Sequence, residues 1–199
     1  MPRRVLHDEY FNKAKAEGYL ARSAYKLIEI QESKKLLRKG DYVLDLGCAP
    51  GAWLQVASEI VGPTGRVLGL DLQTVSHSMP PNVRTIVGDV YKADPVSLLD
   101  TVGGRFNAVL SDMAPNTTGV NDHEMSMRLC DHVVSLLPKL IQPRGSFAIK
   151  VFEGGQYPRL LKDVAALFEN SRGFKPKSSR DVSREIYVVA AGYKGPMTS

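Results

Sequence analysis

The sequence lacks the features that define secreted, membrane-spanning and metal-bound proteins. It has two cysteines, Cys48 and Cys130, among 199 residues, which is too few for a disulfide framework and suits a reducing compartment. Its four histidines are scattered without the spacing of a zinc site, so we expect no metal. No apolar run approaches the length of a membrane span, and the N-terminus lacks the apolar core of a signal peptide. We therefore expect no contact with a membrane.

Positive charge is concentrated at the N-terminal end. Residues 1–40 contain ten Lys and Arg against five Asp and Glu, whereas the rest of the chain contains sixteen of each. The surplus in this segment therefore equals the net charge of +5 of the whole chain. A basic segment suits a polyanionic partner such as RNA, although a solvated helix face explains the same charges.

Helix and strand patterns alternate along the chain. Amphipathic periodicity predicts helices over 8–17, 23–38, 52–61, 95–102, 123–141 and 157–171. Short apolar runs predict strands over 42–47, 66–72, 83–90, 145–154 and 184–193, and residues 106–115 are predicted as a strand that enters a loop. The alternation predicts an α/β fold with a mostly parallel sheet and helices on both faces. We expect one domain over residues 1–199, in which residues 1–40 form a basic helical N-terminal arm.

A glycine-containing loop follows the first predicted strand. The stretch "VLDLGCAPGAW" (43–53) places it at a carboxyl strand end, where doubly wound sheets bind ligands. A nicotinamide-dependent oxidoreductase is one alternative for such a fold. The spacing here, Gly47-x-x-x-Gly51 with Pro50 inside, departs from the G-x-G-x-x-G fingerprint of those enzymes and so counts against this alternative. Trp53 either covers a ligand or packs the following helix. The candidate ligand-binding residues here are Gly47, Cys48, Ala49, Pro50, Gly51 and Trp53.

Three aspartates follow the next three predicted strands. Asp71, Asp89 and Asp112 should meet at one edge of the sheet, with Leu72 and Val90 beside them. Carboxylates there would repel a pyrophosphate, but they suit a ligand with hydroxyls, an exocyclic amine, an ammonium and a sulfonium. That description fits S-adenosylmethionine, with Asp71 on the ribose hydroxyls and Asp89 on the adenine amine. Each aspartate alone could instead be a helix N-cap or a turn residue.

Lys150 interrupts the apolar strand "GSFAIKVFEG" (145–154). A lysine ammonium is costly to bury unless it is paired or has a function. The side chain either extends to the surface with its stem in the core or belongs to a site.

The chain resembles the FtsJ/RrmJ family of ribosomal RNA 2′-O-methyltransferases from residue 22 to residue 192. The matching stretches are "RSAYKL" (22–27), "VLDLGCAPGAW" (43–53), "SDMAPNTTG" (111–119), "GSFAIKVFEG" (145–154) and "SREIYVVAAG" (183–192). The resemblance implies a Rossmann-like methyltransferase fold with a seven-stranded sheet, S-adenosylmethionine as cofactor, and a catalytic tetrad. Carried over by motif, the tetrad falls on Lys26, Asp112, Lys150 and Glu185.

The roles that the resemblance implies agree with elementary chemistry. A ribose 2′-hydroxyl must lose its proton as it attacks a methyl carbon, and Lys150 is the candidate general base, since burial and nearby positive charge favour a neutral lysine. Lys26 would orient the hydroxyl or stabilise the alkoxide. Glu185 would hold a lysine, and Asp112 would position Lys150 and the methionine end of the cofactor.

The resemblance also implies the substrate, the uridine ribose of large-subunit ribosomal RNA in the assembled subunit. A tRNA, an mRNA cap, or a non-catalytic role in ribosome assembly are the alternatives. We expect a monomer in the bacterial cytoplasm, with a mitochondrion as the alternative location. The basic residues expected to contact RNA phosphates are Arg3, Arg4, Lys13, Lys15, Arg22, Lys34, Lys35 and those of segment 175–184.

Overall fold

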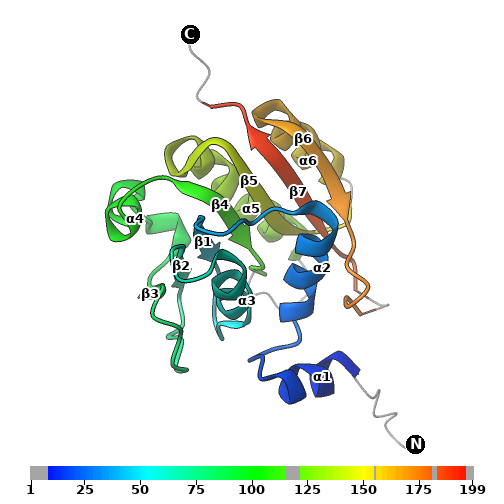
Figure 1. Ribbon diagram of the computed structural model, residues 1–199. Coiled ribbons are helices and arrows are strands. Elements are labelled where there is room, and N and C mark those ends of the chain that lie inside the picture. Colours follow the sequence, from blue (N-terminus) through cyan, green and yellow to red (C-terminus); the bar gives the residue numbers. More distant parts are fainter. Residues whose placement is uncertain (1–8, 115–121, 155, 181–182, 196–199) are drawn as a thin grey trace, which may run out of the picture.

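A seven-stranded sheet lies at the centre of the structure, a computed structural model that describes residues 9–114, 122–154, 156–180 and 183–195 (Figure 1). The helices are α1 (Glu9–Glu17), α2 (Ala24–Lys34), α3 (Ala52–Val61), α4 (Pro95–Val102), α5 (Asp122–Leu140) and α6 (Tyr157–Leu167), with a 3₁₀ turn at Val90–Lys92. The strands are β1 (Tyr42–Leu46), β2 (Arg66–Asp71), β3 (Val83–Val87), β4 (Phe106–Ser111), β5 (Ile141–Phe152), β6 (Phe168–Phe174) and β7 (Glu185–Tyr193).

The strand order is β3-β2-β1-β4-β5-β7-β6, and only β7 runs antiparallel to its neighbours. The chain builds β1, β2 and β3 outward and then returns to place β4 on the other side of β1. Such a reversal opens a crevice at the carboxyl ends of β1 and β4, where ligands bind. The predicted mostly parallel, seven-stranded sheet is confirmed.

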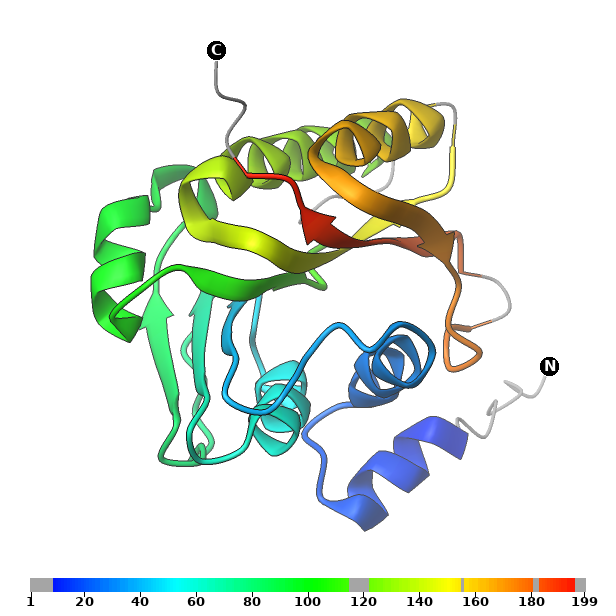
Figure 2. The same cartoon turned by 45° about the horizontal axis from the view of Figure 1, so that its top comes forward.

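Helices cover both faces of the sheet, as predicted. Figure 2 shows α5 and α6 on one face and α2 and α3 on the other. Leu44 and Leu46 of β1 pack in the core with α5, whereas Val43 packs with α2 and α3. Strands buried on both faces explain the near-continuous apolar runs in the sequence. The inner face of α2 is part of this core, since Leu27 and Ile30 are fully buried.

The helix predicted over 23–38 ends earlier, and a side chain is the reason. Lys35 follows α2 in the left-handed conformation, with φ of 53°. The Gln31 amide accepts from the backbone N–H of Leu37 at 2.9 Å and donates to its carbonyl at 2.8 Å. This pair of hydrogen bonds turns the chain back, so that Leu37 is buried.

The prediction of a helix over 157–171 is wrong after Leu167, where β6 begins. The sequence of β6, "FENSRGF", has few residues that favour strands, so its periodicity did not predict one. The strand forms because its backbone pairs with β7 and because Phe168 is buried, with its ring 6.0 Å from that of Phe147. Tertiary pairing therefore overrides the local pattern.

The other predicted elements agree with the structure apart from their ends. The strand predicted over 83–90 ends sooner, at Val87, and the strand within 106–115 enters its loop after Ser111, as predicted. The residues that follow both strands form loops of the site described below. Strand β5 begins at Ile141, ahead of the predicted start. Among the described residues, no helix combines the length and the apolar character needed to cross a membrane.

Candidate active site

A pocket of about 550 Å³ lies at the carboxyl edge of the sheet, as the topology requires. Seven of the predicted ligand-binding residues line it, namely Gly47, Ala49, Asp71, Leu72, Asp89, Val90 and Asp112. These residues come from the loops after β1, β2, β3 and β4. The structure therefore brings together residues that are far apart in the sequence.

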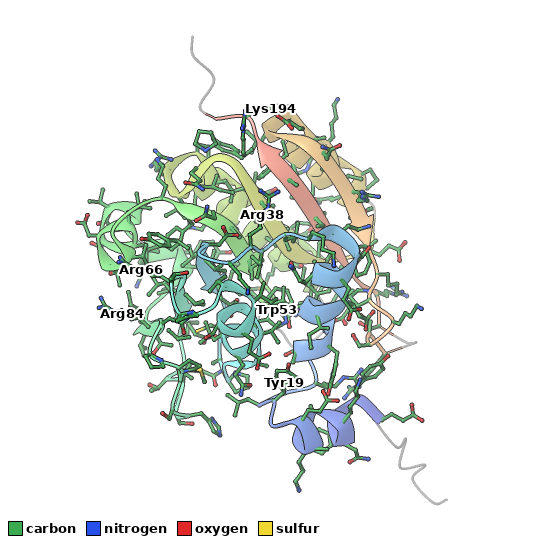
Figure 3. The ribbon with its side chains drawn as sticks, in the orientation of Figure 1. Tyr19, Arg38, Trp53, Arg66, Arg84 and Lys194 are labelled. Atoms are coloured by element: carbon green, nitrogen blue, oxygen red, sulfur yellow. The ribbon has the colours of Figure 1, made fainter. Side chains whose placement is uncertain are left out.

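The remaining predicted loop residues lie outside the pocket lining. Cys48 is buried, and its side chain occupies the space that a side chain at position 69 would need. Pro50 follows a cis peptide bond, and Gly51, with φ of 116°, is the N-cap residue that precedes α3. Trp53 is buried between α3 and α2, as Figure 3 shows, and its indole N–H donates to the carbonyl of Ser23 at 2.8 Å. Trp53 therefore packs against α2 and does not line the ligand pocket.

Apolar side chains complete the pocket, and the sequence reasoning did not identify them. Met113 lines the pocket beside Gly47, whose missing side chain leaves the space that Met113 fills. Met125 and Leu129, one turn apart on α5, also line it. Tyr91 contributes a half-exposed ring whose centroid lies 4.7 Å from that of His132, with the two ring planes tilted by 37°. Of these residues, only Met113 had a signal, since it lies within the motif that contains Asp112.

Two acidic residues of the pocket also organise its loops. Asp71 accepts hydrogen bonds from the backbone N–H groups of Ala49 and Gln73, both at 2.8 Å. Asp89 accepts from the N–H of Tyr91 at 2.9 Å. Asp71 and Asp89 therefore do stabilise a turn and an N-cap, which were the alternative explanations for them, and both also line the pocket. A carboxylate has more acceptor positions than these bonds occupy, so both can also accept from a ligand.

Asp45 is the acidic residue that the sequence reasoning missed. It lies in β1, is fully buried, and has no hydrogen-bond partner within the described part of the chain. Burial raises the pKa of Asp45 well above its usual value, and the charges of Asp112 and Asp71 raise it further. The sequence could have indicated Asp45, because this charged residue interrupts an apolar strand in the way that Lys150 does. A buried carboxylate among other carboxylates favours a cationic ligand.

Two lysine–carboxylate pairs adjoin the pocket. Lys150 Nζ lies 3.1 Å from Asp112 Oδ1 and donates to the Asp112 carbonyl oxygen at 2.5 Å. Lys26 Nζ lies 2.7 Å from Glu185 Oε1. Each of the four side chains is less than one-fifth exposed. The structure therefore brings together the four residues predicted as a tetrad, as two ion pairs.

Electrostatics stabilise the charged form of Glu185. Burial raises the pKa of Glu185, but the hydrogen bond and the positive charge of Lys26 outweigh this effect. The net pKa of Glu185 is lower than its usual value. The Lys26–Glu185 pair is therefore an ion pair at neutral pH.

Strand register places the second pair beside the first. Lys150 on β5 lies directly opposite Tyr187 on β7, and opposed residues point to the same face of a sheet. Glu185 lies two residues from Tyr187 and so points to that face as well. Helix α2 covers this face and supplies Lys26.

A second pocket, of about 350 Å³, adjoins the Lys26–Glu185 pair, and its lining is basic. The residues that line it are Arg22, Ser23, Lys26, Arg180, Ser183 and Glu185. Glu29 of α2 accepts from the N–H groups of Lys177 and Ser178, at 2.6 and 2.9 Å, and so holds the connection after β6. Part of the predicted RNA-binding segment 175–184 is therefore fixed beside the tetrad; Arg3, Arg4 and residues 181–182 lie outside the described residues.

A larger cavity, of about 850 Å³, is not this site. It lies at the amino ends of β2 and β3, where Figure 3 labels Arg66 and Arg84. Its polar side chains bond to one another and to the backbone: Ser58 donates to Asn82 at 2.7 Å, and Arg84 donates to the Thr101 carbonyl at 3.2 Å. No residue of the tetrad lines it.

The fold and this site define the class of the protein as a Rossmann-like methyltransferase. An acidic pocket at the switch point is joined to buried lysine–carboxylate pairs and not to a phosphate-binding glycine fingerprint. In the described part of the chain, no group of three or more His, Cys, Asp and Glu side chains is placed to hold a metal ion. The FtsJ-like methyltransferase family matches residues 19–193, and the chain belongs to this family. The predicted family and enzyme class are confirmed, and the oxidoreductase alternative is excluded.

Named relatives and a solved structure agree with this assignment. The chain is 46% identical over 193 residues to ribosomal RNA large subunit methyltransferase E of Desulfatibacillum aliphaticivorans, covering 96% of this chain and 93% of that protein. A protein of the same name from Halorubrum lacusprofundi is also 46% identical, over 93% of this chain and 70% of that protein. A crystal structure from Plasmodium falciparum, provisionally named a ribosomal RNA methyltransferase, superposes with a TM-score of 0.78 at 29% identity. It covers 89% of this chain and 100% of its own.

We predict that Asp45→Asn makes the ligand-free protein more stable at alkaline pH. Because the pKa of Asp45 is raised on folding, its contribution to stability is present below its unfolded value of about 3.9 and is lost as the pH rises through the folded value. The melting temperature of Asp45→Asn should therefore exceed that of the wild type by an amount that grows as the pH rises over the range above about pH 4. Thermal unfolding measured across this range checks the prediction.

Asp100→Asn, at an exposed position of α4, is the control and should follow the wild type throughout. A difference between Asp45→Asn and the wild type that stays constant with pH would contradict the assignment of a raised pKa.

Proposed function

We propose that the protein transfers a methyl group from S-adenosylmethionine to a ribose 2′-hydroxyl of large-subunit ribosomal RNA. The observation that carries this proposal is the pair of lysine–carboxylate contacts at the junction of an acidic and a basic pocket. A cationic cofactor suits the first pocket, and a polyanionic substrate suits the second. The names of the relatives support ribosomal RNA as the substrate.

The acidic pocket fits S-adenosylmethionine chemically. Asp71 and Asp112, which line this pocket, favour the ammonium and sulfonium charges of the cofactor. Asp71 and Asp89 retain acceptor positions for ribose hydroxyls and the adenine amine, and the ring of Tyr91 offers an apolar surface. When bound, S-adenosylmethionine supplies an electrophilic methyl group.

Each residue of the tetrad then has a task. Lys150 accepts the proton of the 2′-hydroxyl, after its own ammonium has given a proton to solvent. Asp112 fixes the position of Lys150 Nζ through a carboxylate and a carbonyl oxygen. Lys26 stabilises the negative charge that develops on the ribose oxygen, and Glu185 holds Lys26 in place. Alignment of the hydroxyl by these fixed groups supplies much of the rate.

The basic pocket holds the RNA backbone beside the tetrad. Arg22 and Arg180 line it, and contacts of arginine with phosphates position RNA without reading its sequence. The target is a uridine ribose in the assembled large subunit, whose shape supplies the specificity that phosphate contacts lack. We also propose that the protein acts as a monomer in a bacterial cytoplasm, as the bacterial relatives suggest.

The test of this function is methyl transfer from labelled S-adenosylmethionine. The substrates are large ribosomal subunits that lack the modification, free ribosomal RNA, tRNA and capped mRNA. Label on a ribose 2′-oxygen of the subunits supports the proposal. Label on tRNA alone, or on the mRNA cap alone, would identify that RNA as the substrate in place of ribosomal RNA. Cofactor binding without any labelled RNA would favour a non-catalytic assembly factor.

Replacement of the general base should abolish the reaction but not cofactor binding. Lys150→Arg keeps the positive charge beside Asp112 but cannot lose a proton at accessible pH, so kcat should fall by about 10²- to 10⁴-fold. The affinity for S-adenosylmethionine should stay within about twofold, since Lys150 does not line the acidic pocket. Single-turnover methylation and calorimetric titration measure the two quantities. Activity close to the wild type in Lys150→Arg would rule out a base at this position.

The acidic pocket predicts a contrast between two helix-capping aspartates. Asp89 and Asp94 both cap short helices, but only Asp89 lines the pocket. Asp89→Ala should weaken S-adenosylmethionine binding about tenfold by removing one hydrogen bond, whereas Asp94→Ala should leave the affinity unchanged. Equal affinities in the two variants would remove Asp89 from the cofactor contacts.

The basic pocket predicts a salt-dependent contribution from Arg180. Arg180→Ala should weaken RNA binding and reduce the slope of log affinity against log salt by about 1. Lys162→Ala removes the same charge from an exposed position of α6, on the opposite face of the sheet, and should change neither quantity. Filter binding over a series of salt concentrations measures both. If the two variants lose affinity equally, the basic pocket has no special place in RNA binding.

A further inference from the structure

Tyr187 lies at the centre of the tetrad, although the sequence reasoning gave it no role. It is fully buried on β7, and its hydroxyl donates to Asp112 Oδ1. Its ring lies 5.9 Å from Lys26 Nζ, and it is the cross-strand neighbour of Lys150. Tyr187 therefore touches members of both ion pairs.

The ring of Tyr187 is held from behind. Trp53 stacks against it with centroids 5.8 Å apart and an interplanar angle of 30°. Trp53 is itself tied to the residue that precedes α2, through the hydrogen bond to Ser23. The hydroxyl of Tyr187 consequently has a fixed position relative to Asp112 and to the helix that carries Lys26.

We propose that Tyr187 is a positioning residue that competes with Lys150 for Asp112 Oδ1 and so weakens the hold of Asp112 on protonated Lys150. Both donors reach the same oxygen, Lys150 Nζ at 3.1 Å and the Tyr187 hydroxyl. A hydrogen bond to a carboxylate disperses its charge, which reduces its attraction for a neighbouring ammonium. Lys150 then reaches the neutral form that a base requires at lower pH. This inference rests on the proposed role of Lys150.

The hydroxyl of Tyr187 remains a donor at any working pH. Burial raises the pKa of Tyr187 well above its usual value, and the charge and the hydrogen bond of Asp112 raise it further. Its influence on Asp112 is therefore constant while Lys150 titrates.

Other titratable groups surround the Lys150–Asp112 pair. Lys26 and Glu185 face it as an ion pair from α2 and β7, and Asp45 approaches from β1. Cys130 of α5 lies behind the strand, with its Sγ 3.4 Å from the Lys150 carbonyl oxygen. Burial raises the pKa of Cys130 to about 12, so the thiol is neutral at working pH. Substitution of Tyr187 by phenylalanine leaves all of these groups in place.

The experiment compares Tyr187→Phe with the wild type in methyl transfer across pH. We expect the midpoint of the alkaline rise in kcat to move upward by about one pH unit, which is about a tenfold loss of kcat on the acidic side and little loss above the midpoint. The affinity for S-adenosylmethionine should be unchanged, since Tyr187 does not line its pocket. Tyr193→Phe is the matched control: Tyr193 is buried on the same strand but in the other core layer, and its hydroxyl has no partner among the described residues.

A loss of kcat by the same factor at every pH, or no change at all, would overturn the competition. A second measurement needs no turnover: carbon-13-labelled lysine follows the titration of Lys150 by NMR in both proteins, assigned through Lys150→Arg. If that titration shifts upward in Tyr187→Phe but the wild type methylates no RNA, the proposed function is wrong and the effect of Tyr187 on Lys150 is supported. If the wild type methylates the ribose but the titration does not shift, the proposed function is supported and the effect of Tyr187 on Lys150 is wrong.

Discussion

The burial of two lysine–carboxylate pairs at one edge of the sheet is the constraint on which the rest of this structure depends. An ammonium or a carboxylate in a nearly dry position is costly unless its partner is held at contact distance. Asp112 after β4, Lys150 on β5, Glu185 on β7 and Lys26 on α2 must therefore be in place together. Loss of any one leaves a buried charge without its partner, so that strand register and helix position are fixed by chemistry as well as by apolar packing.

The antiparallel β7 makes this arrangement possible. It brings Glu185 and Tyr187 alongside Lys150, on the face that α2 covers. The same edge separates two electrostatic environments. Carboxylates from three parallel strands gather on one side, and the connection after β6, tied to α2 by Glu29, brings Arg180 to the other. A cation and a polyanion are thereby attracted to adjacent pockets, and the tetrad lies where they meet.

The accuracy of the sequence reasoning followed the range of the interactions involved. Short-range patterns predicted the alternation of strands and helices, the sheet and the family, all of which are confirmed. The helix predicted over 157–171 failed because β6 exists only through pairing with β7 and the burial of Phe168. The end of α2 was misplaced because a single side chain, Gln31, turns the chain back. The resemblance to a known family, and not periodicity, supplied the seventh strand and the assignment of Lys26 and Glu185 to the tetrad.

The sequence by itself determined which residue types stand at the carboxyl ends of successive strands, and it exposed one anomaly, a lysine in an apolar strand. These are local properties, because the period of a strand and the position of its end follow from adjacent residues. Only the tertiary structure decided the partners. The ion pair of Lys26 with Glu185, the hydrogen bond from Trp53 to Ser23 and the hydrogen bond from Tyr187 to Asp112 each join segments distant in sequence. Such contacts depend on distances of a few ångströms between separate elements, and those distances exist only after the sheet has assembled.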